Sequence, residues 1–292
     1  MSVNSIYSEI NASLLSIAKS LKIISKPQNI IDISIGESTS YHWSYEYKCL
    51  IEIDNVSSID FNLLKGVDNA RDILLQNTIQ FANGFAANNA LLWGARGMGK
   101  SSLIKATHAK INAEQKNADK RLILIEIDRE ELGSLPILMR SIAKLDAQFL
   151  IFCDDLSFDK DETSYKSLKT ILDGGLEGRP KNVLFYATSN RRHIMARDMI
   201  DNEKSTAINP SEAVEEKISL SDRFGLWLGF HSCDQATYLN MVQGYITHYK
   251  IKIGENELKA RAIEWSATRG ARSGRVAIQF VKQIAGEMGK NI

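Results

Sequence analysis

Two hydrophobic patterns alternate through the middle of the chain. Short continuous apolar runs of strand length are separated by longer stretches in which apolar positions recur every three or four residues, as on one face of a helix. The predicted strands are Ala90–Trp93, Arg121–Ile127, Gln148–Cys153, Val183–Thr188 and Leu226–Phe230, and the predicted helices are Val67–Phe85, Ser101–Gln115, Leu135–Ala147 and Ser164–Leu172. Strands that alternate with helices predict an α/β fold with a parallel sheet covered on both faces.

The N-terminal end of the chain has a different pattern. Residues 4–23 have the apolar spacing of a helix face, and Asn29–Ile35 and Tyr47–Ile53 are short Ile-rich segments that predict strands. Aromatic residues alternate with polar ones from Tyr41 to Tyr47, which indicates an aromatic strand face or, alternatively, a ligand surface. We expect residues 1–63 to form a small α+β extension.

The C-terminal end is predicted to be helical. Residues 234–248, 255–268 and 273–288 have helical periodicity, and Ser273 suits the N-cap position of the last helix. We therefore expect a helical lid over residues 233–292, following an α/β domain over residues 64–232.

A glycine-rich segment between a predicted strand and a predicted helix has the pattern of a phosphate-binding loop. Gly94-Ala95-Arg96-Gly97-Met98-Gly99-Lys100-Ser101 matches GxxxxGK[ST]. Glycines allow a tight turn that points backbone N–H groups at phosphate oxygens, and the start of the helix, including Ser102, adds its positive end. Lys100 is expected to contact the β- and γ-phosphates, and the Ser101 hydroxyl to bind Mg²⁺.

Two carboxylates follow the predicted strand Gln148–Cys153. The C-terminal ends of strands are where α/β sheets bind ligands, so Asp154 is a candidate for holding Mg²⁺ through water and Asp155 for polarising an attacking water. A solvated acidic turn is the ordinary alternative. Asp154 lies 54 positions after Lys100, which leaves room for an intervening strand and helix, so the acidic strand is third in sequence.

Further polar residues follow other predicted strands and helices. Asn190, directly after Val183–Thr188, is a candidate for orienting water, or alternatively an ordinary turn residue. Arg223 is a candidate arginine finger for a neighbouring subunit, with Arg191 and Arg192 as rivals. Arg275 falls in the first turn of the last helix, where a cation opposes the helix dipole unless a phosphate lies nearby; Arg272 is the alternative.

Composition narrows the class of protein. Net charge is +1, so no global field draws the chain to nucleic acid or membrane, although a local patch is compatible with this value. Three widely spaced cysteines and five scattered histidines form no metal motif or disulfide framework. No apolar run has the length of a membrane span, and the N-terminus lacks a secretory pattern. These features predict a cytoplasmic protein with no membrane partner.

In the order of these motifs, the chain resembles the AAA+ ATPases over about residues 64–288. The glycine-rich loop, Asp154-Asp155, Asn190, Arg223 in SDRFG and Arg275 in GRVA look like Walker A, Walker B, sensor 1, arginine finger and sensor 2. Leu64-Lys65-Gly66-Val67 resembles the family's segment near the adenine. The segments FCDDLSF, YATSNRRHIM and LSDRFGLWLGF look like those of an uncharacterised bacterial family of such proteins. Most relatives have Asp-Glu in place of Asp154-Asp155, and the replication-initiator branch resembles this chain in using Asp-Asp.

This resemblance implies a P-loop NTPase with a three-layer α/β/α sheet, a helical lid, and ATP and Mg²⁺ as cofactors. ATP is favoured over GTP because no guanine-reading NKxD motif follows the acidic strand. The leading hypothesis is an ATPase, working as a homo-oligomer, that remodels or loads a protein or nucleic-acid partner. The alternatives are a helicase-loader-like or transposition-helper-like ATPase acting on nucleic acid, and a nucleotide-gated binding module with little turnover.

Overall fold

A computed structural model describes residues 13–14, 31–114, 121–157, 168–169, 171–173, 178–190 and 222–292. Within these residues, seven strands form one sheet in the order β2-β1-β4-β5-β6-β3-β7. The strands are β1 (Ser40–Ser44), β2 (Cys49–Glu52), β3 (Ala90–Gly94), β4 (Leu122–Glu126), β5 (Gln148–Cys153), β6 (Val183–Ser189) and β7 (Leu226–Phe230). All neighbouring strands pair in parallel except β1 and β2, which form an antiparallel hairpin. The predicted parallel α/β sheet is confirmed.

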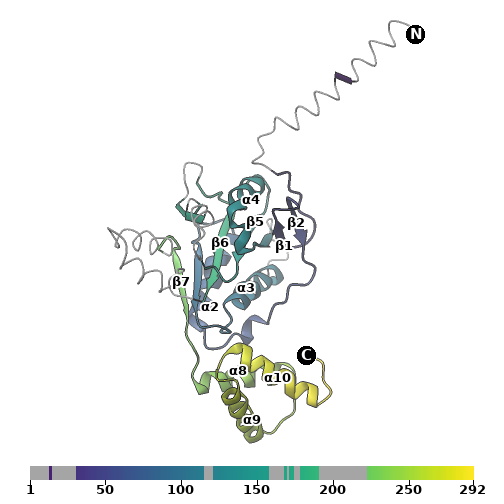
Figure 1. The fold of residues 1–292 in the computed structure, drawn as a ribbon, viewed down its shortest axis with the longest axis vertical. Coiled ribbons are helices and arrows are strands. Elements are labelled where there is room, and N and C mark those ends of the chain that lie inside the picture. The colour runs from purple at the N-terminus through teal and green to yellow at the C-terminus, as the bar shows by residue number, and fades with distance from the viewer. Residues whose placement is uncertain are drawn as a thin grey trace, which may run out of the picture.

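The sheet separates two apolar layers, as the alternation of side chains along each strand requires, and helices lie on both of its faces (Figure 1). Helices α2 (Asp68–Ala82) and α3 (Lys100–Glu114) pack on one face, against side chains such as Leu124 and Phe152. Helix α4 (Leu135–Ile142) packs on the other face, against Ile123 and Ile151. The 3-10 helices η1 (Phe61–Leu63) and η2 (Arg129–Ser134) precede α2 and α4.

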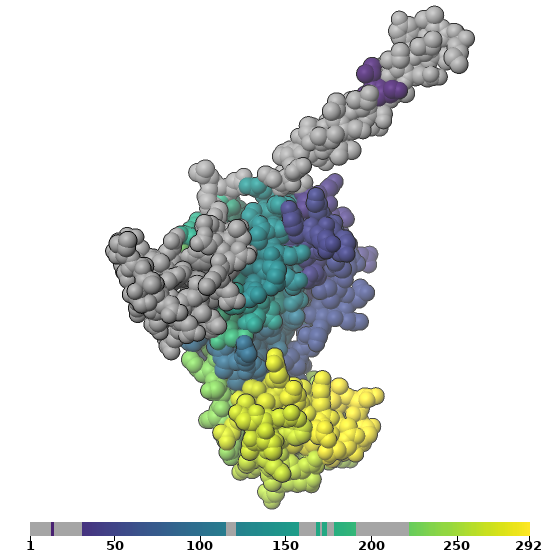
Figure 2. Space-filling model, in the orientation of Figure 1, coloured from purple at the N-terminus to yellow at the C-terminus, as the bar shows by residue number. Residues whose placement is uncertain are grey.

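Three C-terminal helices form a lobe at one end of the molecule. They are α8 (Gln235–His248), α9 (Glu255–Thr268) and α10 (Gly274–Glu287). Figure 2 shows this lobe, in yellow-green and yellow, projecting beyond the body of the sheet. Ser273 caps α10 as predicted, because its side chain accepts a hydrogen bond from Val276 N at 3.3 Å. In the described part of the chain, no helix has both the length and the apolarity needed to cross a bilayer.

The N-terminal predictions are only partly correct. Residues 31–35 of the predicted strand Asn29–Ile35 form no strand: Ile33 is buried beside α4, and Ile31 N donates to Ser141 Oγ on that helix at 3.0 Å. The predicted strand Tyr47–Ile53 is confirmed as β2, over Cys49–Glu52, and it forms a hairpin with β1. The aromatic alternation is also divided, because Tyr41 and Trp43 are buried in β1 whereas Tyr45 and Tyr47 lie in the exposed turn.

Several predicted segments lie outside the described residues. These are the helix face of residues 4–23 apart from positions 13–14, and the positions of Arg191 and Arg192. The predicted helix Ser164–Leu172 is described only at positions 168–169 and 171–172, which are helical. The helix predicted for Leu135–Ala147 ends at Ile142, because a turn over the next residues leads directly into β5.

Candidate functional site

The glycine-rich loop lies between β3 and α3, at the C-terminal edge of the sheet. Gly94, Gly97 and Gly99 have φ values of 126°, 74° and 91°, a region that residues with a Cβ rarely adopt. A Cβ on Gly94 would lie 2.1 Å from the backbone oxygen of Phe230 on β7. The loop therefore needs glycine at position 94 for space as well as for conformation.

The inner side of the loop is rich in hydrogen-bond donors. Among the described residues, none accepts a hydrogen bond from the backbone N–H groups of residues 97–102, which include the first turn of α3. The helix dipole adds partial positive charge at the same place. Free N–H groups at a helix start fit phosphate oxygens, so this loop has the donors that the sequence predicted.

Lys100 lies within the loop and is 7% exposed. Its ammonium group donates to Gly94 O and Ala95 O, each at 2.9 Å, and to Asn190 Oδ1 at 3.0 Å. Burial lowers the pKa of Lys100, and the nearby carboxylates of the acidic pair oppose this effect. These acceptors hold the ammonium group at the loop, where phosphates are expected.

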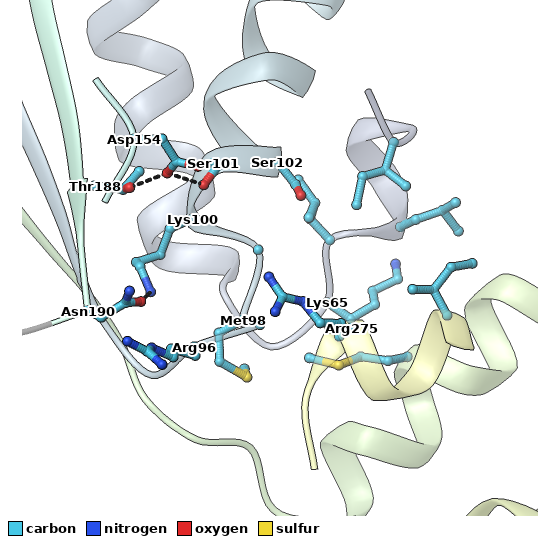
Figure 3. Close-up of a pocket in the computed structure, with 18 of the residues that line it drawn as sticks. Lys65, Arg96, Met98, Lys100, Ser101, Ser102, Asp154, Thr188, Asn190 and Arg275 are labelled. Carbon is cyan, nitrogen blue, oxygen red and sulfur yellow. Dashed lines mark hydrogen bonds between the residues drawn. The ribbon is translucent and has the colours of Figure 1, made fainter. Parts of the chain in front are cut away.

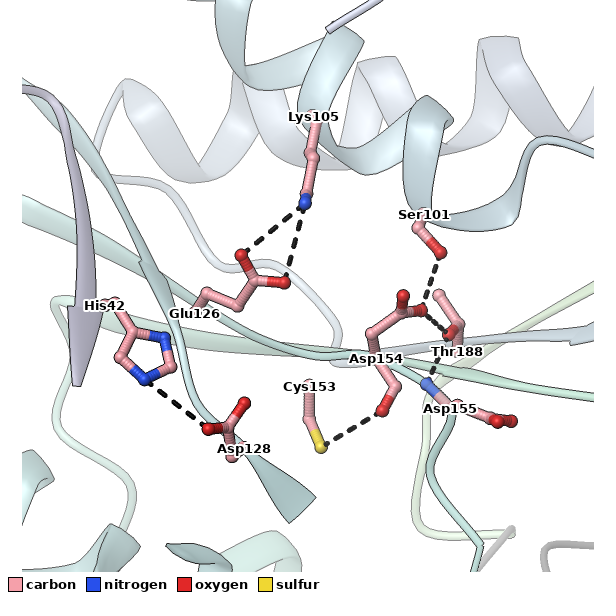
Figure 4. Close-up of polar contacts among 9 residues, drawn as sticks. All are labelled: His42, Ser101, Lys105, Glu126, Asp128, Cys153, Asp154, Asp155 and Thr188. Carbon is pink, nitrogen blue, oxygen red and sulfur yellow. Dashed lines mark hydrogen bonds and ion pairs between the residues drawn. The ribbon is translucent and has the colours of Figure 1, made fainter. Parts of the chain in front are cut away.

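The acidic pair begins one residue after β5 ends. Asp154 Oδ1 accepts hydrogen bonds from Ser101 Oγ at 2.6 Å and from Thr188 Oγ1 at 2.5 Å (Figure 4). Its other oxygen, Oδ2, accepts no hydrogen bond from the described residues. The two predicted Mg²⁺ ligands, Ser101 and Asp154, are therefore in direct contact.

Asp155 turns towards the neighbouring strand β6. Its backbone has φ 49°, in the left-handed region, and its carboxylate accepts a hydrogen bond from Asn190 Nδ2 at 2.6 Å. Since Asn190 also accepts from Lys100, the amide side chain connects the loop lysine to the second carboxylate. The predicted grouping of Lys100, Asp155 and Asn190 is present in the structure.

A cavity of about 530 Å³ contains these groups and changes character along its length. The polar end holds Lys100, Ser101 and both carboxylates. The apolar part of the lining comes from η1, its flanking residues and the lid: Ile59, Leu63, Leu64, Met241, Tyr245 and Ile278. A cavity that combines cationic, acidic and apolar side chains has the chemistry that a nucleotide requires.

The lid also contributes a cation. Arg275 lines the cavity, and its backbone N–H donates to Gly97 O at 3.1 Å. In Figure 3, Arg275 and Lys65 lie on one side of the loop, opposite Lys100 and Asn190. Arg96 and Arg275 both act against the charged form of Lys100, so the cavity gathers positive charge before any anion enters it.

Not every predicted site residue lines this cavity. Gly94 and Ala95 do not, although their carbonyls bind Lys100, while Arg96, Gly97, Met98, Gly99 and Ser102 do. Arg223 also lies outside the lining, and its guanidinium group pairs closely with Asp173.

The sequence did not identify several residues that line the cavity, among them Ile59, Leu63, Thr188, Met241, Tyr245 and Ile278. Thr188 lies two positions before Asn190, where strand alternation turns its side chain towards the site, so that spacing was an available signal. Met241 and Tyr245 share a face of α8 at i, i+4 spacing, but such a pair is equally typical of ordinary core packing.

Sheet order, loop and lid together define the class of protein. The phosphate loop follows β3, the acidic pair follows β5, β6 lies between these two strands, and a helical lid follows β7. This is the AAA+ type of P-loop fold.

Two solved structures from Aeropyrum pernix are similar to the chain. The Orc1 protein in complex with DNA has a TM-score of 0.56 and 13% identity, with 79% of this chain covered. The ORC2 protein, in ADPNP–ADP complexes, has a TM-score of 0.54 and 11% identity, with 82% of this chain and 67% of that chain covered. The chain spans 64% of the Orc1 chain that it matches. At these identities the likeness concerns the fold.

The family is established by sequence. Residues 36–288 match the family described as "Protein of unknown function (DUF815)", and the chain belongs to that family. Among curated proteins, none matches the chain significantly.

Proposed function

We propose that this protein binds ATP with Mg²⁺ and hydrolyses it to ADP and phosphate. One observation carries the proposal: a single cavity contains the loop amides, Lys100 and the Ser101–Asp154 contact. The first two suit a polyphosphate, and the third suits a hard cation that prefers oxygen ligands. Within the described residues, no three His, Cys, Asp or Glu side chains group as a metal cage. A hydroxyl and one carboxylate suit Mg²⁺, which usually keeps waters and phosphate oxygens as its other ligands.

Each polar residue has a proposed role. Lys100 and the loop amides hold the phosphates, while Ser101 and Asp154 hold Mg²⁺, which neutralises charge on the phosphate oxygens. Asp155 accepts a hydrogen bond from the attacking water, and Asn190 orients both. Arg275 contacts the phosphates from the lid of the same subunit. These roles follow the positions of the side chains around the cavity.

We further propose that the active form is a homo-oligomer in which Arg223 reaches a neighbouring subunit's nucleotide. Arg223 lies outside the lining of its own cavity, as a residue acting on another subunit would. Trans-acting arginines contribute large rate factors in related phosphoryl-transfer sites. The division into residues 1–63, 64–232 and 233–292 is part of this proposal, with the lid closing on the nucleotide.

Remodelling or loading of a macromolecular partner is the proposed use of the hydrolysis energy. Nucleic acid is the partner class that we favour, because the similar Orc1 structure is a complex with DNA and basic residues outnumber acidic ones in residues 233–292.

A second candidate function is a nucleotide-gated switch with little turnover. The short side chain of Asp155, already bonded to Asn190, favours that reading.

The decisive experiment measures Mg²⁺-dependent ATP hydrolysis across protein concentrations, beside Lys100→Ala and Arg223→Ala. We expect turnover per subunit to rise with concentration, Lys100→Ala to lose nucleotide binding, and Arg223→Ala to lose turnover while still binding nucleotide. Binding without turnover at any concentration would favour the switch. Absence of nucleotide binding by the unaltered protein would refute the proposal.

A further inference from the structure

Thr188 contacts three consecutive residues at the end of the acidic strand. Its hydroxyl donates to Asp154 Oδ1 at 2.5 Å and accepts from Asp155 N at 2.9 Å, and its carbonyl accepts from Leu156 N at 2.6 Å. The side chain is 1% exposed. One hydroxyl thus satisfies a carboxylate and a backbone N–H at once, which uses its single proton and one lone pair.

These contacts hold a backbone that would otherwise relax. Asp155 is one of three described non-glycine residues with positive φ, and such a conformation persists when surrounding contacts determine it. At this left-handed turn the Asp154 carboxylate points towards Ser101 on α3 (Figure 4), and the Asp155 carboxylate accepts a hydrogen bond from Asn190. Without the Thr188 hydroxyl, nothing else among the described residues bonds the Asp155 N–H.

The hydroxyl also distinguishes the two oxygens of Asp154. Oδ1 is shared by Ser101 and Thr188, so Oδ2 is the oxygen that remains for a metal-bound water. A carboxylate that is free to rotate would exchange these oxygens and would bond Ser101 less consistently. Residues that orient a metal ligand in this way often affect function nearly as much as the ligand itself.

We propose that Thr188 is a positioning residue that fixes the Asp154–Asp155 pair for Mg²⁺ and water. This inference rests on the proposed function, because it assigns a role within the same nucleotide site. Thr188 itself does not touch the reacting atoms. It acts through the two carboxylates, by bonding one side chain and the backbone of the other.

Three variants isolate the hydroxyl. Thr188→Val keeps the volume and β-branching but removes the hydroxyl, and Thr188→Ser restores it. Thr107→Val is the matched control, since Thr107 on α3 is also fully buried and its hydroxyl has no hydrogen-bond partner among the described residues. The same chemical change is thus made with and without the contacts.

The first measurement is amide hydrogen exchange of the full chain without nucleotide or metal. We expect Thr188→Val to speed exchange at the Asp155 amide about fivefold, the factor for one net hydrogen bond, with no change in Thr107→Val or Thr188→Ser. Unchanged exchange in Thr188→Val would overturn the inference whatever the protein binds.

The second measurement is nucleotide binding and hydrolysis as Mg²⁺ is varied. In Thr188→Val, we expect the half-saturating Mg²⁺ concentration to rise or kcat to fall by about 10–100-fold, with little change in nucleotide affinity without metal. Thr188→Ser should recover most of the loss. If Thr188→Val and Thr188→Ser lost the same amount of Mg²⁺ affinity or kcat, or if Thr188→Val lost none, the role of the hydroxyl would be overturned. If the unaltered protein shows no Mg²⁺-dependent binding, the proposed function fails, and the role of Thr188 at the metal fails with it.

Discussion

His108 is a titratable group buried beneath the sheet, away from the candidate site. It lies on α3 and is 3% exposed, and its Nε2 is 3.0 Å from the carbonyl oxygen of Leu122 on β4. Burial lowers the pKa of His108 to about 4, because the charged imidazolium loses its hydration there. The folded protein therefore holds this ring neutral under conditions where an exposed histidine would take up a proton.

The consequence is a loss of stability in mild acid. Between pH 6.5 and about 4 the unfolded chain binds a proton at His108 that the folded chain does not, so the free energy of unfolding decreases as pH falls through this window. The full effect is about 3 kcal/mol. Denaturant unfolding at pH 7.5 and 5 should show a smaller pH dependence in His108→Gln. The exposed control His248→Gln should keep the pH dependence of the unaltered protein. If the unaltered protein and both variants showed the same change in the free energy of unfolding with pH, this assignment would be contradicted.

Single residues were predictable from the sequence where one chemistry needs one residue type. The loop glycines, Lys100 and Ser101 fall into this class, because spacing alone identifies them. Thr188 does not, since a threonine at the end of a strand is common. Its role depends on the neighbouring strand β5, which is brought beside β6 only by the folded sheet. The contacts that Thr188 makes with Asp154 and Asp155 exist only in the folded protein, so the sequence alone does not reveal them.

Among the elements, the hairpin β1–β2 was predicted in part: the sequence indicated the strand Tyr47–Ile53 and an aromatic strand face from Tyr41 to Tyr47, but not their pairing or the place of β1 in the sheet. β1 pairs with β4 in parallel and thereby joins the N-terminal segment to the sheet that carries the candidate nucleotide site. Trp43 at its centre is fully buried, and its indole N–H donates to Ser134 Oγ at 2.8 Å, next to α4. The hairpin is anchored to the sheet by this side chain as well as by its ladder.

Removal of this anchor should destabilise the whole protein. We expect Trp43→Ala to lower the free energy of unfolding by about 3–5 kcal/mol, as for large aromatic residues in other cores. Tyr47→Ala, in the exposed turn of the same hairpin, should change it by less than about 0.5 kcal/mol. Chemical denaturation measures both. Near-equal stability of Trp43→Ala and the unaltered protein would show that the hairpin folds separately from the sheet.

The elements that the sequence predicted well share a physical property. Gln148–Cys153 and Leu226–Phe230 were predicted with the observed bounds, because buried parallel strands are continuous apolar runs between clear breaks. Residues 31–35 instead alternate Ile with Asp32 and Ser34, and they lie beside α4 without a ladder. Apolar residues in a segment indicate that it contacts the core, whereas its pairing as a strand depends on whether the edge of another strand is open beside it.

At the scale of the molecule, the cavity has walls from separate segments of the chain: the residues around η1, the phosphate loop, strands β5 and β6, and the lid. A ligand that bridges these parts stabilises the folded state, since the unfolded chain cannot bind it. The sequence predicted that these motifs occur in the order of one site. It did not predict how the lid packs, because Met241, Tyr245 and Ile278 are not distinguishable from core residues.

Bound nucleotide should therefore raise the unfolding temperature. With Mg²⁺ and a non-hydrolysable ATP analogue at 100 times Kd, the expected gain is about 2.7 kcal/mol. Chelation of Mg²⁺ should reduce this gain, and Lys100→Ala should abolish it. Lys110→Ala, further along the same helix and outside the lining of the cavity, should keep it. A gain that survives in Lys100→Ala would place nucleotide binding elsewhere on the protein.

The close approach of lid and loop has a thermodynamic consequence. Gly97 O accepts from Arg275 N, and a Cβ on Gly97 would come within 3.0 Å of Ser273 Oγ. The glycine-rich loop and the start of α10 thus share one contact surface. A molecule that binds the lid and breaks this contact would change the affinity of the protein for nucleotide. Because coupled binding is reciprocal, nucleotide would change the affinity of the protein for that molecule by the same factor. A partner that binds the outer surface of α8, α9 and α10 would therefore be coupled energetically to nucleotide binding.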